Sequence, residues 1–580
     1  MIALALAAAL LAQDVAEQEP NNQQDKAKQE LAPGAALTGS LDPEGDQDWF
    51  FVLCEKETVC SLALEVAEGD SARIEIHLPR GALSTPAKDG TILARRVLFP
   101  KGRTAVRLDG RAKRYRCAIT VEEKGERQEV EPNSEIKEAH EIRLGETWRG
   151  EQSGFNSEMD CYVFKATSEG PYELVLKCLP RKEGPFHGYI GLFGTDPLKV
   201  DYYYINDYAD DFHFYPVLDA GTWNLHFTIG ADTPAGSAYE ISVKSMGGRV
   251  TEVERKAALA AIDRAVKFLQ VIPEEPLQQL ASAVESMALA ALSEGAGAKE
   301  RREALDRDIV ARLEGQFWKV EGAPVFYVNN NIYTHAMATL GLAEAAANGS
   351  EKAKALAIKA AEFLVATQNT ERKPAALKGP IDREARGYGG WRYSPEDATS
   401  DLSIVGWCLI ALTAVDAAGL KVAGLRDAIE AGLRYVGSVG NEKGFGYEQP
   451  QGSGSNIHNS IGALMMLLYG DECPALGFAK AHLDRHLWSA TQVDDGEGYP
   501  FYYLYYATRA QYLRSGDVWE TWRATALRQL LRRQREDGSW AGFGLESAPG
   551  ARWTTAIGLM MVRLCLNEPP KYLRVEAKGF

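Results

Sequence analysis

The chain has 580 residues, of which 45% are hydrophobic and 25% charged, and its formal net charge is −16. The length provides for three or four domains, and the composition is that of an ordinary globular protein rather than a fibrous or disordered one. The acidic balance argues against a nucleic-acid-binding surface. The dense basic cluster, Arg528, Arg532, Arg533 and Arg535, is interpreted as the solvated face of one helix.

The first twelve residues, Met1 to Ala12, are almost entirely apolar and precede a polar run that extends to Glu30. The apolar run is too short to span a bilayer and is typical of a signal peptide. We therefore expect export to the periplasm or cell surface, with a frayed N-terminal helix as the alternative. No other stretch is long and apolar enough to predict a transmembrane helix. The true start codon and the cleavage site stay open, because no Lys or Arg precedes the run.

The next part of the chain contains a duplication. The sequence EPNN at 19–22 recurs as EPNS at 131–134, and DWFFV at 48–52 recurs as DCYVF at 160–164, both with an offset of 112 residues. The landmarks predict two homologous domains, at 14–125 and 126–246. In each copy apolar residues alternate with other residues, which predicts β-strands; Cys60, Leu62, Leu64 and Val66 are one such set.

Short strands bounded by Gly, Pro and Asp predict two β-sandwiches. The EPN sequence, the glycine pair that follows it and the Asp-aromatic sequence resemble the bacterial pre-peptidase C-terminal (PPC) domain. That resemblance implies β-sandwiches of the kind attached to secreted enzymes and surface proteins. The acidic and aromatic insertion at 201–212 is interpreted as a surface hairpin, with a calcium or glycan contact as the alternative.

No metal site or cofactor is predicted. Asp46, Asp48 and Asp160 are interpreted as turn and strand-start residues, and none of the eight cysteines has a zinc-site spacing. Cys161 and Cys178 flank a predicted hairpin that turns at 168–171, so an exported chain could join them as a disulfide. The alternative for every cysteine is a small buried apolar residue.

From about residue 253 the hydrophobic period changes from two to 3.6, and Leu259, Ile262, Val266 and Leu269 are expected to share a buried helix face. Twelve helices in pairs would fit an α/α toroid, with an inner and an outer layer around one cavity, over residues 253–580. Their expected first residues are Val253, Leu277, Glu300, Ile332, Ala353, Leu402, Arg426, Asn456, Ala475, Tyr502, Trp519 and Thr554.

The joints between helices repeat. Gln534, Gly538 and Trp540 form the complete copy, and Gln368 is separated by a charged insertion from the sequence GYGGW that ends at Trp391. A glycine can end the helix in the left-handed conformation, while Gln bonds loose backbone groups and Trp packs against it. This pattern resembles the structural QW motif of the squalene-cyclase/prenyltransferase repeat, and the resemblance implies a helical toroid.

The chemistry that this resemblance implies is missing. The cyclases supply an acid in an Asp-x-Asp-Asp motif, and the nearest pair here, Asp494-Asp495, is interpreted as a helix terminator. The prenyltransferases bind zinc with Asp, Cys and His, yet Cys408, Cys473 and Cys565 lack the expected Asp-x-Cys. The thioester sequence of complement-like toroids is absent as well. The chain is therefore not expected to be a standard cyclase or prenyltransferase.

The joints are rich in aromatic residues, which are expected to line the cavity and bind a ligand, although rings packed between helices are the alternative. The ligand-binding candidates are Tyr333, Trp391, Tyr393, Trp407, Tyr447, Tyr499, Tyr503, Tyr506 and Trp553.

The catalytic candidates are His335, Asp401 and His458, each at the start of an expected inner helix. Their structural alternatives are a helix N-cap for Asp401 and packing for the two histidines. If all three converge on the cavity, an acid/base pair is possible.

The sequence thus predicts an exported protein that binds an apolar, isoprenoid-like ligand or a glycan, with no nucleic-acid partner. The alternative is an enzyme with a replaced active site, either terpenoid-modifying or a polysaccharide lyase or hydrolase. A structural scaffold is the third possibility.

Overall fold

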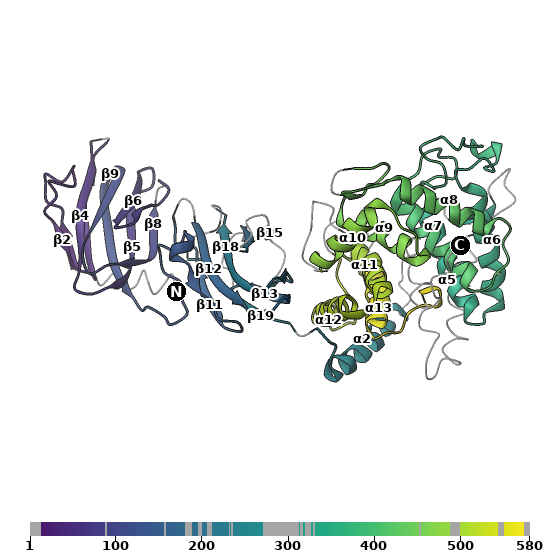
Figure 1. The fold of residues 1–580 in the computed structure, drawn as a ribbon. Coiled ribbons are helices and arrows are strands. Elements are labelled where there is room, and N and C mark those ends of the chain that lie inside the picture. Colours follow the sequence, from purple (N-terminus) through teal and green to yellow (C-terminus); the bar gives the residue numbers. More distant parts are fainter. Residues whose placement is uncertain are drawn as a thin grey trace. The chain divides into compact units, whose positions relative to one another are not determined.

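A computed structural model describes most of the chain and divides it into two compact units, Met1–Met246 and Gly247–Phe580. We call these the β-rich unit and the helical unit (Figure 1). The described residues are 13–43, 45–87, 90–155, 158–179, 188–194, 200–205, 211–230, 233, 236–246, 248–270, 313, 317–319, 326–328, 331–451, 454–487, 499–542 and 550–573.

The first copy of the β-rich unit has two sheets joined by one long strand, β9. One half of β9 pairs with β4 and β6, and the other half pairs with β3 and β5. Apolar side chains on alternate positions meet between the sheets as one buried cluster. The strands are β1 (Gln13–Ala16), β2 (Glu30–Leu31), β3 (Ala35–Leu41), β4 (Gln47–Cys54), β5 (Thr58–Val66), β6 (Ser71–Leu78), β7 (Gly81–Ser84), β8 (Thr91–Phe99) and β9 (Gly102–Glu122).

The second copy repeats this topology, with β18 and β19 in the place of the two halves of β9. Strand β5 begins and ends 112 residues before β13, so the sequence offset is preserved in the strands. The strands are β10 (His140–Glu141), β11 (Thr147–Glu151), β12 (Glu158–Ala166), β13 (Gly170–Cys178), β14 (Gly188–Phe193), β15 (Val200–Ile205), β16 (Asp211–Phe214), β17 (Val217–Leu218), β18 (Gly221–Ile229) and β19 (Ala238–Ser245); the 3-10 turn η1 is Ile136–Glu138.

The hairpin expected between Cys161 and Cys178 is wrong. The chain turns after β12, but β12 pairs with β18 in one sheet while β13 pairs with β19 in the other. Cys161 lies opposite His226 and Cys178 lies opposite Tyr239, so they are not cross-strand neighbours, and both are free thiols. Turn residues mark where a chain reverses, but the choice of sheet depends on which apolar faces meet.

The helical unit contains ten described α-helices, and those near its centre are buried on almost every side. The central helices follow one another in space as α5, α7, α9, α11 and α13, and α6, α8, α10 and α12 pack outside them. The helices are α2 (Glu252–Gln270), α5 (Ile332–Ala347), α6 (Glu351–Thr367), α7 (Leu402–Ala417), α8 (Leu425–Ser438), α9 (Asn456–Tyr469), α10 (Pro474–Arg485), α11 (Pro500–Arg514), α12 (Gly516–Arg533) and α13 (Ala551–Cys565); the shorter elements are β20 (Phe317–Lys319), β21 (Phe326–Val328), β22 (Gly440–Asn441), β23 (Gly444–Phe445), η2 (Ala375–Leu377) and η5 (Lys571–Leu573).

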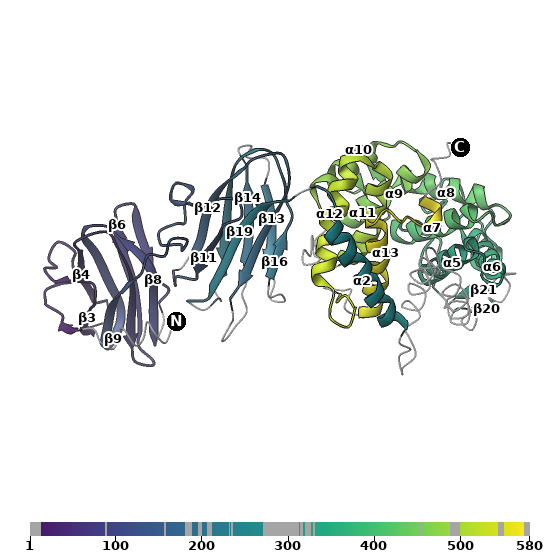
Figure 2. The ribbon, with the colours of Figure 1, turned by 90° about the horizontal axis from the view of Figure 1, so that it is seen from below.

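Helix α2, the first of the helical unit, packs against α12 and α13 near its end, and both ribbon views show them side by side (Figure 2). The buried face of α2 consists of Ala258, Ala261, Ile262, Ala265 and Leu269. The expected face was partly wrong, because Leu259 is exposed. Small alanines let the backbone of α2 come close to its neighbours, and a search for large apolar residues misses such a face.

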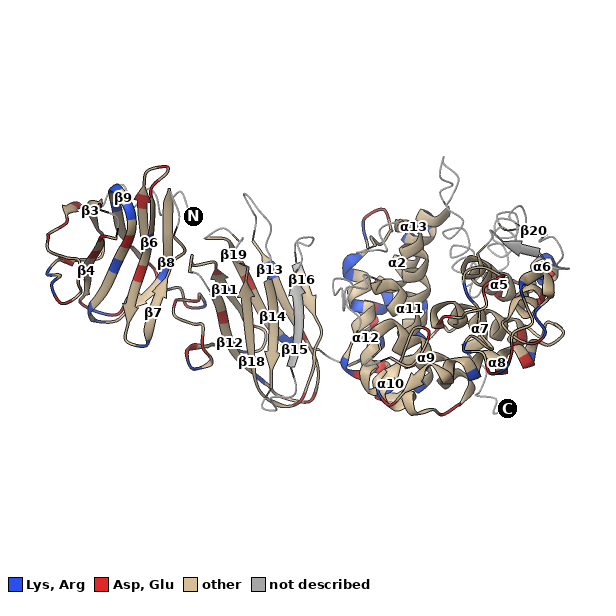
Figure 3. Cartoon of the chain, turned by 90° about the horizontal axis from the view of Figure 1, so that it is seen from above, with Lys and Arg blue, Asp and Glu red and all other residues tan. Residues whose placement is uncertain are grey.

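Lys and Arg gather on α12 (Figure 3). One of them, Arg528, forms an ion pair with Glu254 of α2, with its Nε 2.6 Å from a carboxylate oxygen. The basic cluster that the sequence suggested as a solvated face therefore also ties the first helix to the last pair.

Two joints have the same hydrogen bonds. Gln534 Nε2 donates to Gly538 O and to Ala261 O of α2, and the Trp540 indole N–H donates to Leu530 O at 2.7 Å. Gln368 Nε2 likewise donates to Gly389 O and to Ala428 O of α8, and the Trp391 indole donates to Leu364 O at 2.8 Å.

The two joint glycines have φ values of +89° and +87°, and a Cβ on either would lie within 2.3 Å of a carbonyl oxygen of the next outer helix. Only glycine fits such a position without strain. The charged insertion after Gln368 therefore leaves the geometry of that joint unchanged.

Among the described residues, no helix is long and apolar enough to cross a membrane. Several expectations lie outside the described residues: the apolar run 1–12, the helices expected from Leu277 and Glu300, and the pair Asp494-Asp495. The ten other expected helices begin within three residues of the observed first residues.

Candidate functional site

The first turns of the central helices lie at one end of the helical unit, which we call the mouth. Ile332 N–H at the start of α5 donates to Tyr393 O, and Leu402 N–H at the start of α7 donates to Tyr447 O. The Tyr333 ring stacks on Tyr502 of α11 with centroids 6.3 Å apart, so α11 begins there as well. Each loop carbonyl satisfies a helix N–H that has no partner within its own helix.

Tyr393 and Tyr447 occupy equivalent positions in successive joints, each two residues after a buried ring, Trp391 and Phe445. Their hydroxyl oxygens lie 3.4 Å apart. Tyr393 is 46% exposed, whereas Tyr447 is half-buried and stacks on His458 with centroids 5.4 Å apart. The mouth thus presents an open aromatic face backed by a second phenol and an imidazole.

Charged groups surround these rings. Arg392 forms an ion pair with Glu448. Asp401 is fully buried at the N-cap of α7, where its Oδ1 accepts a hydrogen bond from Ile404 N–H, as the sequence predicted. Its Oδ2 has no hydrogen-bond partner. Burial raises the pKa of Asp401 to about 6, an effect that the cap hydrogen bond, Arg392 and Tyr447 partly offset.

The three catalytic candidates do not converge. His335 is buried beside α6, where its Nε2 lies 2.8 Å from Ala360 O and its ring contacts Phe363 edge to face. Asp401 and His458, in contrast, both neighbour Tyr447. Burial lowers the pKa of His458 to about 4, so this imidazole is neutral at neutral pH. One acid and one imidazole therefore flank the same phenol.

A cluster of rings lies next to the mouth. Trp407 donates its indole N–H to the Tyr502 hydroxyl at 2.9 Å, and its ring contacts Tyr333 and Tyr506. The Tyr506 hydroxyl is buried and has no hydrogen-bond partner. Two of these four candidates, Trp407 and Tyr506, are fully inaccessible in this structure.

The remaining aromatic candidates differ in exposure. Trp391 and Trp553 are buried, and Tyr503 is buried with its hydroxyl bonded to His486 O at 2.6 Å. Tyr499 is 40% exposed and contacts the Tyr502 ring. The accessible candidates at the mouth are thus Tyr393, Tyr447 and Tyr499.

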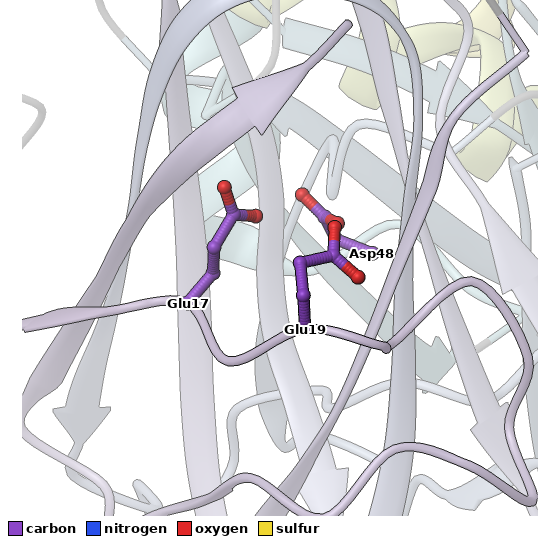
Figure 4. A group of neighbouring side chains, drawn as sticks. All are labelled: Glu17, Glu19 and Asp48. Carbon is purple, nitrogen blue, oxygen red and sulfur yellow. The ribbon is translucent and has the colours of Figure 1, made fainter. Parts of the chain in front are cut away.

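A second kind of site lies in the β-rich unit. Carboxylate oxygens of Glu17, Glu19 and Asp48 lie within 4.8 Å of one another, and Figure 4 shows the three side chains pointing toward a common centre. Asp48 is fully buried, and neither of its oxygens has a hydrogen-bond partner. None of the three acids forms an ion pair with a described Lys or Arg, and burial raises the pKa of Asp48 to about 8.

The second copy contains the same cluster. Glu129, Glu131 and Asp160 are all buried, their oxygens also lie within 4.8 Å, and each follows its counterpart by 112 residues. Glu131 Oε1 and Asp160 Oδ1 have no hydrogen-bond partner. Burial raises the pKa of Glu131 to about 8 and that of Asp160 to about 7.

An asparagine accompanies each carboxylate cluster. Asn21 and Asn133 are buried, and each has a side-chain oxygen without a hydrogen-bond partner. Four oxygen-bearing side chains and no nitrogen or sulfur ligand suit a hard cation such as Ca²⁺. The sequence analysis assigned Asp48 and Asp160 to turns and strand starts; the signal that it missed was the recurrence of both glutamates at the same offset.

Comparisons with known proteins give distant likenesses. No family model matches the chain, and no curated protein does. A D-mannose isomerase aligns over 54% of this chain and 99% of its own, with 13% identity and a TM-score of 0.40. The type II terpene cyclase MstE from Scytonema aligns over 54% and 100%, with 14% identity and a TM-score of 0.34. The pre-peptidase C-terminal domain of a collagenase from Bacillus anthracis aligns over 18% and 94%, with 20% identity and a TM-score of 0.16. Similarity at this level carries no conclusion about activity.

Proposed function

We propose that the mouth of the helical unit binds a glycan. The observation that carries the proposal is the pair of equivalent tyrosines, Tyr393 and Tyr447, whose hydroxyl oxygens lie 3.4 Å apart beside the Arg392–Glu448 ion pair. Sugar rings stack on exposed aromatic faces, and their hydroxyls need charged or polar partners close by. An isoprenoid would leave Arg392, Glu448 and Asp401 desolvated without partners, which is costly.

The proposal fits a wider assignment of the chain. In it, residues 1–12 are a signal peptide, 14–125 and 126–246 are PPC-like sandwiches, and 253–580 are a helical toroid related to the squalene-cyclase/prenyltransferase repeat. The protein is exported, and its sandwiches make surface contacts.

Replacing Tyr393 by alanine is expected to weaken glycan binding by about tenfold or more, because a central aromatic anchor contributes about 2 kcal/mol. Binding would be measured on an array of soluble oligosaccharides and then by calorimetry on the best ligand. Tyr189, which is 38% exposed in the second copy, offers a matched control, and its alanine variant should bind as the wild type does. Equal losses in both variants, or binding of isoprenoid lipids alone, would refute the proposal.

An enzymatic role at the same place is the alternative. It is favoured by one observation, the unbonded Oδ2 of Asp401 on one side of Tyr447 and the neutral His458 on the other. A carboxyl with a pKa of about 6 can donate or accept a proton near neutral pH. Cleavage of an array glycan by the wild type but not by Asp401→Asn would support this role, whereas binding without turnover would support the binding role.

We propose further that each β copy holds a divalent cation between its carboxylates, with Ca²⁺ as the best fit. Unpaired buried carboxylate oxygens in both copies support this assignment. Two binding sites are expected by calorimetric titration with Ca²⁺. Saturation at a hundred times the dissociation constant would add about 2.7 kcal/mol of stability per site.

The duplication supplies matched variants for this test. Asp48→Asn should remove one site and Asp160→Asn the other. Without Ca²⁺ each variant should be at least as stable as the wild type, because it removes a buried charge from a cluster of like charges, and with Ca²⁺ each should be less stable. A wild type that binds no Ca²⁺, or variants that both keep two sites, would contradict the assignment.

A further inference from the structure

Two cysteines meet in the core of the first β copy. Cys54 is the last residue of β4 and Cys60 lies in β5, and they are 3% and 0% exposed within the same buried cluster. Their thiols are in hydrogen-bonding contact. Strand β4 pairs with one half of β9 and β5 with the other half, so the two side chains approach each other from different sheets.

The pair lies at the edge of the core. The residues between the two strands, 55–57, are exposed, so only a short surface loop covers the thiols. A disulfide needs a sulfur–sulfur distance of about 2 Å, and thiols already in contact can reach it by small side-chain rotations. The bond would close a loop of only a few residues and would join the two sheets.

The second copy shows that the architecture does not require cysteine here. At the same offset of 112, Ala166 occupies the place of Cys54 and Tyr172 that of Cys60, and both are buried. Tyr172 donates its hydroxyl hydrogen to Ser168 O at 2.8 Å. The cysteine pair is therefore a feature that the first copy has and its duplicate lacks.

We propose that Cys54 and Cys60 are an oxidation site and form an intrachain disulfide that links the two sheets of the first copy. The oxidant is a disulfide, either a small molecule or the active-site disulfide of an oxidoreductase. One thiolate attacks the oxidant, forming a mixed disulfide and releasing a thiolate. The second cysteine then attacks the mixed disulfide at the protein sulfur and releases the other oxidant thiolate. The two cysteines lose two protons and two electrons, and the oxidant is reduced to two thiols.

The environment of the pair sets when this reaction occurs. Burial raises the pKa of Cys60 to about 12 and also raises that of Cys54, so thiolate is scarce once the core has formed. Exchange is therefore expected during folding, or when the loop at 55–57 opens. The inference is independent of glycan or cation binding, and it would suit the oxidising compartment that an exported protein enters.

The test is to refold the full chain with glutathione disulfide, or with dithiothreitol, and to map free thiols by alkylation and mass spectrometry. The expected result is a Cys54–Cys60 cross-linked peptide after oxidation, with the other six cysteines alkylated after denaturation. The oxidised protein should also be cleaved by protease within residues 13–122 about tenfold more slowly than the reduced protein.

Cys54→Ala, which introduces the residue found in the second copy, should abolish the cross-link and the protection. The double variant Cys161→Ala, Cys178→Ala should change neither. Recovery of Cys54 and Cys60 as free thiols after oxidative refolding, or a cross-link between other cysteines, would overturn the proposal. Should Cys54→Ala fail to fold, Cys54→Ser serves the same purpose.

Discussion

Replacing Trp540 by alanine is expected to lower the free energy of unfolding of the helical unit by about 3–5 kcal/mol. The ring is fully buried, and it packs so closely on Gly558 of α13 that a Cβ there would lie 2.9 Å from the indole. The substitution also leaves Leu530 O without the indole N–H that bonds to it at 2.7 Å. A cavity and an unsatisfied carbonyl would thus arise together at the joint that fastens α12 and α13 to α2.

The measurement is the urea midpoint of the helical circular dichroism signal, with hydrogen exchange of α2, α12 and α13 as a local readout. Trp540→Phe keeps most of the ring and loses the hydrogen bond, so it should cost about 1 kcal/mol more than ring shrinkage alone. Trp391→Ala tests the equivalent joint and should give a loss of similar size. A cost below about 1 kcal/mol for Trp540→Ala would mean that the joint does not hold these helices together.

Replacing Asp401 by asparagine is expected to stabilise the helical unit at neutral pH but not in acid. In the folded protein the pKa of Asp401 is about 6, against an ordinary value of 3.8, so between these values the folded state binds more protons than the unfolded state. Wild-type stability therefore falls as pH rises through this window, by about 3 kcal/mol in total. Asparagine has no proton to lose, and it can still accept the cap hydrogen bond from Ile404 N–H.

The difference in stability between Asp401→Asn and wild type should thus be near zero at about pH 4 and reach about 3 kcal/mol by about pH 7. Urea unfolding of both proteins across this range would measure it. Asp401→Ala removes the cap as well and should lie about 1 kcal/mol below the asparagine variant at every pH. A difference that does not change with pH would show that Asp401 is ionised or neutral alike in both states.

That outcome bears on function. Asparagine caps a helix as well as aspartate does, so an ionisable group that lowers stability at this position favours a role in binding or proton transfer. The binding array and the turnover test on Asp401→Asn address the two roles separately.

The local geometry of the joints could be predicted from the sequence. Gln534, Gly538 and Trp540 stand at fixed spacing, and the hydrogen bonds of Gln534 and Trp540 within the joint follow from that spacing. The helix starts were predictable for the same reason, since they depend on caps and on periodic apolar residues close in the chain. The cap role of Asp401 is one example.

The sites could be predicted only in part. Nothing in the spacing of Asp401, Tyr447 and His458 says that the first and last meet at the second, because three helices and two loops separate them in space and sequence. His335 begins an inner helix as they do, yet its position in the first turn points it toward α6. The carboxylate clusters form because β4 and β12 bring an aspartate back to the glutamates of the preceding segment.

The sequence by itself determined the duplication, the change from strands to helices and the positions of ten helices, because these depend on local periodicity and on recurring residues. Only the tertiary structure decided which sheet each strand joins, which candidates meet at the mouth and which cysteines touch. The physical reason is that packing of apolar faces brings together residues far apart in the chain. Cys54 and Cys60 became neighbours across two sheets, while Cys161 and Cys178, which seemed paired along the chain, were separated.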